Sequence, residues 1–171
     1  MIALGIDGVE VSLPVAAALA AFASKDATRP HLGVGVSGRN LVATDGHRLV
    51  SFPLSETVSI HHGKVWSREY VETMIKVARA IKAKSIVLAF AACLQGHKLP
   101  PTEQVMPDYG MTATESIGFM PEYVADLGKV CKACGADGAI LSHARGALDP
   151  LGYTVRGREM TALAVVMPMR H

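Results

Sequence analysis

The order strand, helix, short strands recurs three times along this chain, in segments of about 57 residues that together make up its 171 residues. The first segment places an apolar helix over residues 13–23, after a strand-like stretch. The second and third segments predict helices over residues 67–83 and 121–134, each followed by short strands with alternating apolar residues. The pattern predicts an α+β fold of about three strand-helix-strand units, with helices packed on antiparallel sheets.

Composition narrows the class of protein. Half of the residues are hydrophobic and 19% are charged, which excludes disorder for most of the length. The net charge of +2 neither requires nor excludes a nucleic-acid partner. Three cysteines favour a protein of the reducing cytoplasm over a secreted disulfide scaffold. The apolar run Leu13 to Ala23 follows acidic residues and falls far short of the ~20 residues of a membrane span, so we expect a buried helix there.

One unusual segment is VATDGHRL, residues 42–49. Asp-Gly is a strong hairpin signal, and a tight turn between two strands accounts for Asp45 and Gly46. It leaves the following pair, His47 and Arg48, without an explanation.

A second unusual segment is AVVMPMRH, residues 164–171. It is apolar, and Pro168 cannot donate to a sheet ladder, so the chain leaves the sheet there or forms its edge. Methionine adapts to varied partner surfaces. Two interpretations stay open: a last strand packed into the core, or one wall of a peptide groove.

The cysteines allow a zinc hypothesis. Cys131 and Cys134 form a CxxC, and Cys93 with His97 would complete a zinc-type ligand set. The CxxC pair also falls on the apolar side of a predicted helix, where buried free cysteine is ordinary. Neither a glycine-rich phosphate loop nor a nucleophile tied to His47 is found, so we predict no cofactor, no metal and no enzymatic activity. A metal-dependent enzyme is the competing class.

Basic residues are placed on or just after the predicted helices. Such residues form either a solvated helix face or a surface that contacts phosphates, which needs charge but no base-reading geometry. We predict non-specific DNA contact for Lys25, Arg29, Lys76, Arg79, Lys82, Lys129 and Lys132.

Three motifs carry a resemblance to a known family. ATDGHRL (43–49), MPDY (106–109) and VVMPMR (165–170) resemble, in this order, segments of the bacterial sliding clamp, the DNA polymerase III beta subunit. Residues 64–81 and 118–130 are similar to helix regions of that family. The resemblance implies a DNA-clamp-like fold.

The resemblance also implies a domain organisation. Residues 1–110 look like the clamp's middle domain, and residues 111–171 like the second half of its third domain, with the first domain absent. The hairpin expected near residues 93–99 looks shortened. The family closes twelve units around duplex DNA, so an equivalent ring of three-unit chains would be a tetramer.

A pocket for short linear peptide motifs, typically containing glutamine, leucine and phenylalanine, is implied as well. The matching positions are Thr44, Gly46, His47, Arg48, Leu49, Pro107, Val165, Met167, Pro168, Met169 and Arg170. Leu49, Val165, Pro168 and the methionines would form an apolar slot, and Arg48 and Arg170 would hold peptide carbonyls or an acidic side chain. Residues 110–112 depart from the family pattern, which leaves part of that wall undefined.

The function implied is that of a cytoplasmic processivity factor without membrane contact. It would encircle double-stranded DNA as a homo-oligomeric ring, without reading sequence, and tether a polymerase or repair partner through the pocket. The alternative is a decoy or adaptor that binds clamp-binding peptides without forming a ring.

Overall fold

The computed structural model describes residues 7–26, 28–29, 31–54, 63–102, 110–111, 120–144 and 149–168. Pro107, Met169 and Arg170, which the resemblance assigns to the peptide pocket, lie outside the described residues.

The first unit comprises β1 (Gly8–Ser12), α1 (Leu13–Phe22), β2 (Val34–Ser37), β3 (Asn40–Thr44) and β4 (Arg48–Pro53). Pro14 lies in the first turn of α1, where its missing N–H costs no hydrogen bond. Nearly every residue of α1 from Val15 onward is buried. The expected buried helix is therefore present. None of the helices in the described part of the chain is long and apolar enough to span a membrane.

The second unit comprises β5 (Val65–Trp66), α2 (Arg68–Ala80), β6 (Ser85–Ala89) and the short 3-10 helix η2 (Phe90–Ala92). The Ser67 hydroxyl accepts a hydrogen bond from the backbone N–H of Tyr70 at 3.1 Å, and so caps α2. Residues 93–102 contain no strand. Within the described residues, β6 consequently pairs only with β1.

The third unit comprises α3 (Pro121–Ala125), α4 (Leu127–Cys134), β8 (Ile140–Ala144), β9 (Leu151–Arg156) and β10 (Thr161–Val166). The short strand β7 (Gly110–Met111) pairs in parallel with β8. The sequence predicts one helix over 121–134, whereas the structure interrupts it at Asp126. Gly135 ends α4 in the left-handed conformation, with φ of 65°.

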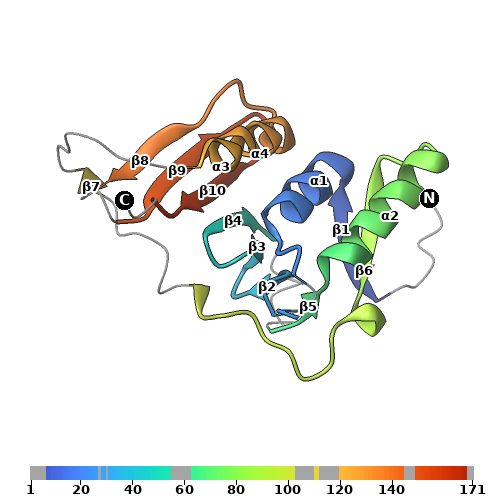
Figure 1. Cartoon of the computed structure of the whole chain (residues 1–171). Coiled ribbons are helices and arrows are strands. Elements are labelled where there is room, and N and C mark those ends of the chain that lie inside the picture. The colour runs from blue at the N-terminus through green and yellow to red at the C-terminus, as the bar shows by residue number, and fades with distance from the viewer. Residues whose placement is uncertain are drawn as a thin grey trace.

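One eight-stranded sheet contains strands of all three units, in the order β5-β2-β3-β4-β10-β9-β8-β7. At the junction β4 pairs antiparallel with β10, and Leu49 lies opposite Val165. The helices lie on one side of the sheets, where α1 lies beside both α4 and α2 (Figure 1). Residues of all three units share one hydrophobic core. The junction thus places residues of β4 beside residues more than a hundred positions later in the chain.

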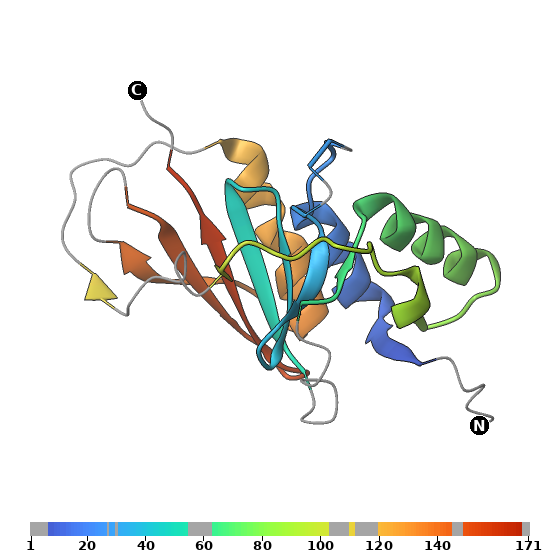
Figure 2. The same cartoon turned by 90° about the horizontal axis from the view of Figure 1, so that it is seen from below.

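A segment that we call the strap, residues 98–102, crosses the face of the sheet opposite the helices (Figure 2). At one end, the hydroxyls of Thr102 and Ser37 are 2.8 Å apart and buried. A Cβ on Gly35 would lie 2.6 Å from the Lys64 carbonyl oxygen and 2.8 Å from Cδ1 of Leu99. Only glycine at this position lets the strap approach β2 so closely.

Candidate functional site

The bend between β3 and β4 and the segment that follows β10 lie against each other. The backbone N–H of Met167 donates a hydrogen bond of 2.8 Å to the carbonyl of His47. Beside this contact is a pocket of about 140 Å³. Its lining is Thr44, Gly46, His47, Arg48, Leu49, Pro100, Pro101, Thr102, Val165 and Met167. All the pocket residues predicted from the sequence that the structure describes are therefore present in it, except Pro168.

The pocket is small and mainly apolar. Leu49 and Val165 form its buried floor, and Pro100 and Pro101 of the strap form a wall that the sequence did not predict. The Thr44 hydroxyl donates a hydrogen bond to the Arg48 carbonyl at 2.8 Å and accepts one from the Gly46 N–H. Its hydrogen-bonding capacity is therefore used within the protein. Pockets for whole small molecules usually measure about 300–1,000 Å³. This one suits a single apolar side chain.

Asp45 shapes the bend that carries His47. One of its carboxylate oxygens accepts hydrogen bonds from the backbone N–H groups of His47, at 2.9 Å, and Arg48, at 3.0 Å. Gly46 has φ of 91°, a conformation that favours glycine. The hairpin interpretation of Asp45 and Gly46 is therefore correct, and the same turn presents the exposed His47 at the pocket rim.

The guanidinium of Arg48 makes its hydrogen bonds to other groups of the protein. Nε donates to Asp45 at 2.8 Å, Nη1 donates to Asp126, and Nη2 donates to the Ala21 carbonyl at 2.8 Å. The side chain is only 9% exposed. The geometry therefore differs from the expectation that Arg48 holds peptide carbonyls or an acidic side chain: it ties the bend to the end of α1 and to the α3–α4 junction.

Tyr123 of α3 is the aromatic neighbour of this network. The Arg48 guanidinium lies 4.7 Å from its ring centroid, and the His47 ring stacks on it at 6.5 Å with an interplanar angle of 20°. Sequence reasoning assigned Tyr123 only to an apolar helix side. The only sequence feature that points to Tyr123 is its aromatic ring two residues after Pro121. Helical periodicity does not show that this side of the helix contacts a turn 75 positions earlier in the chain.

The charges of the network stabilise one another. Burial alone would raise the pKa of the Asp126 carboxyl, but hydrogen bonds from Lys129 and Arg48 outweigh burial, and the pKa is lowered. For Arg48, burial would lower the pKa, but the two aspartates outweigh it and the pKa is raised. Arg48 and Asp126 are therefore both ionised at neutral pH.

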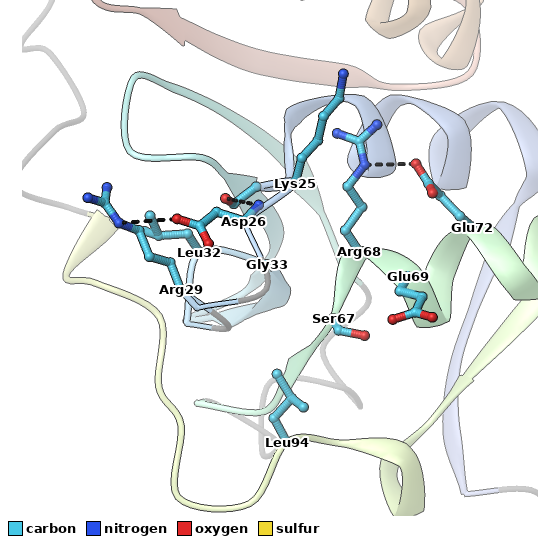
Figure 3. Close-up of a pocket in the computed structure, with 11 residues that line it drawn as sticks. Lys25, Asp26, Arg29, Leu32, Gly33, Ser67, Arg68, Glu69, Glu72 and Leu94 are labelled. Atoms are coloured by element: carbon cyan, nitrogen blue, oxygen red, sulfur yellow. Dashed lines mark hydrogen bonds and ion pairs between the residues drawn. The ribbon is translucent and has the colours of Figure 1, made fainter.

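A larger pocket, of about 420 Å³, lies between the loop after α1 and the beginning of α2 (Figure 3). Four of its charged lining residues form two ion pairs. Arg68 bonds Glu72 at 2.7 Å, and Arg29 lies 3.7 Å from Asp26. Because these pairs offset the local charges and no nucleophile is set beside a base, the smaller apolar pocket is the better candidate for a functional site.

The cations predicted to contact DNA lie on the helices or on the loops that follow them. All of them are exposed: Lys25, Arg29, Lys76, Arg79, Lys82, Lys129 and Lys132. Lys129 donates to Asp126 at 2.6 Å, and Arg29 faces Asp26. Two of the predicted contacts are thus paired within the chain.

The cysteines sit apart from the pocket. Cys131 and Cys134 lie on α4, Cys93 follows η2, and all three are free thiols. Burial raises the pKa of each thiol. Among the residues described, no three His, Cys, Asp or Glu side chains gather in a way that could hold a metal ion.

Comparison with known proteins identifies the fold. No family model matches the sequence, and no curated protein matches it. The fold matches the beta sliding clamp of C. crescentus with a TM-score of 0.65 at 16% identity, covering 100% of this chain and 67% of that one.

Two further sliding clamps match the fold of this chain. The DNA polymerase sliding clamp of Bacillus subtilis matches with a TM-score of 0.63 at 15% identity, over 98% of this chain and 65% of that one. The beta subunit from the DNA polymerase of Streptococcus pyogenes matches with a TM-score of 0.58 at 12% identity, over 100% and 68%. The chain therefore has the bacterial sliding-clamp fold, as the resemblance implied, and spans about two thirds of the length of these proteins.

Proposed function

We propose that this protein is a clamp-like tether that binds a short peptide segment of a replication or repair protein in the pocket at the β4–β10 junction. One observation carries the proposal. Residues 44–49 and 165–167, far apart in sequence, converge on a small apolar pocket. An apolar side chain of the peptide fills it, and a few such buried anchors supply most of the affinity of an interface.

The wider part of the proposal is a homo-oligomeric ring around double-stranded DNA, in the cytoplasm. The sliding-clamp fold and the exposed cations of α2 and α4 support it. Contacts of these cations with phosphates need no base-reading geometry, so the ring would hold DNA without regard to sequence. Residues 1–110 would act as the middle domain of a clamp and 111–171 as half of another, with four chains closing the ring.

A decoy or adaptor without a ring is the second candidate. The observation that favours it is that residues 93–102 supply no hairpin beside β6. Such a protein would bind the same peptides but would leave DNA free. Both candidates need the pocket, and they differ only in assembly.

The pocket is tested with Met167→Ala and a fluorescent peptide that contains glutamine, leucine and phenylalanine. Met167 is half-buried at the pocket wall, so its truncation removes contact with the anchor and spares the core. We expect the dissociation constant from fluorescence polarisation to rise about 30-fold, or about 2 kcal/mol. The matched control is Met120→Ala, 40% exposed and outside the pocket, which should leave the affinity unchanged. Equal affinity of both variants would contradict the proposal.

A further inference from the structure

We propose that Leu99 determines the size of the peptide side chain that the pocket accepts, because it divides one apolar trough into two cavities. The inference rests on the proposed function and adds the residue that sets its specificity. Leu99 belongs to the strap, and no sequence motif singles it out.

The first step is the position of the Leu99 side chain. It packs against a small cluster made by Val42, Leu49 and Val165, which is separate from the main core. Leu49 and Val165 are also the floor of the peptide pocket. The side chain of Leu99 therefore does not line the pocket itself but packs against two residues of its floor.

A second cavity lies along the strap. It measures about 280 Å³ and is lined by Val36, Ser37, Gly63, Lys98 and Leu99, together with Pro100 and Pro101. The two prolines line both cavities, whereas Leu99 lines only the larger one. Because Leu99 also packs on Leu49 and Val165, which line the smaller pocket, its side chain fills the space between the larger cavity and the floor of the pocket.

The strap is anchored independently of the Leu99 side chain. The Ser37–Thr102 contact holds one end, and the rings of Pro100 and Pro101 fix their φ angles. Shortening Leu99 should therefore open the partition and leave the strap in place. In the native protein the pocket of about 140 Å³ admits a compact aliphatic anchor and excludes a large aromatic one.

The experiment compares two peptides that differ only at the anchor position, Leu or Trp, on the native protein and on Leu99→Ala. We expect the native protein to bind the Leu peptide at least tenfold more tightly, and Leu99→Ala to lose or reverse this preference. General destabilisation weakens both peptides alike and leaves their ratio unchanged. Leu99→Met conserves volume and should keep the native preference.

The cavity is tested separately, without peptide, with benzene as the probe. Apolar cavities opened by truncation bind benzene. In Leu99→Ala, where one cavity would join both sites, benzene should shift the NMR signals of Val36 and Leu49 at the same benzene concentration. In the native protein and in Leu99→Met, the two signals should respond at different concentrations, because two separate cavities fill. The milder Leu99→Val serves if Leu99→Ala fails to fold.

The outcomes separate the two proposals. Peptide binding with an unchanged Leu-to-Trp ratio, and separate benzene responses of Val36 and Leu49 in Leu99→Ala, would overturn the role of Leu99 and leave the pocket standing. A joint benzene response of both residues in Leu99→Ala, with no peptide bound by any of the proteins, would support Leu99 as the partition and refute the proposed function.

Discussion

At the scale of single residues, Arg48 lines the pocket and also ties the surrounding backbone together through its guanidinium. Removing a guanidinium from water is costly, and the loss is offset here by two carboxylates and a carbonyl. The guanidinium also lies over the Phe22 ring at 5.1 Å. Arg48 is therefore a positioning residue, which holds the bend that presents His47.

The pH dependence of stability follows from Asp126. Its pKa is lowered in the folded protein, so its contribution is complete above the unfolded value of about 3.9 and is lost as pH falls through the lower folded value. Asp126→Asn removes this contribution. We expect the difference in unfolding free energy between the native protein and Asp126→Asn to be constant above about pH 5 and to shrink below about pH 4.

Urea denaturation at a series of pH values measures this difference. Asp149→Asn, at an exposed aspartate with no ion pair among the described residues, is the control and should track the native protein at every pH. A difference between the native protein and Asp126→Asn that does not change with pH would contradict the role given to the carboxylate.

At the scale of elements, the sequence predicts what local patterns encode. The apolar run gives α1, the alternation of Leu151 to Arg156 gives β9, and Asp-Gly gives the turn at residue 45. It does not predict the interruption at Asp126 or the path of the strap. Both depend on contacts with distant parts of the chain, namely Arg48 in the first case and Ser37 in the second.

The turn between β9 and β10 closes the end of α4. The Glu159 N–H donates to the Cys134 carbonyl at 3.0 Å, and so satisfies a carbonyl that the helix leaves free. A Cβ on Gly157 would overlap that same carbonyl. The β9–β10 hairpin therefore reaches α4 only because residue 157 lacks a side chain.

Substitution at Gly157 should be costly for this reason. Gly157→Ala forces the turn off α4, and we expect at least about 2 kcal/mol of destabilisation, measured by urea denaturation. Gly128→Ala is the matched control, since no atom lies within 4 Å of the added Cβ on α4. It should stabilise the protein by about 0.5–1 kcal/mol, because alanine favours a helix. A similar effect of both substitutions would contradict this account of the turn.

At the scale of the whole molecule, the site could be predicted only in part. The family motifs led to residues 44–49 and 165–167, which β4–β10 pairing brings together. Tertiary packing alone places Pro100 and Pro101 at the pocket wall and Tyr123 beside Arg48. No local sequence pattern around these three residues encodes their positions.

Assembly around DNA separates the ring from the decoy. We expect a ring to remain on closed circular duplex and to slide off the same duplex after linearisation, at low salt, because topology rather than contact holds it. Equal retention on both forms would indicate ordinary electrostatic binding and would contradict the ring. No retention on either form, with peptide binding intact, would favour the decoy.

The β4–β10 junction has a consequence for biosynthesis. A ribosome makes residues 44–49 early, but the floor of the pocket needs Val165, which is made more than a hundred residues later. A chain that ends before Val165 therefore lacks the pocket, however well its first unit has folded. On the proposed function, a peptide can bind only after both stretches have been made and paired, and its binding in turn stabilises the folded state.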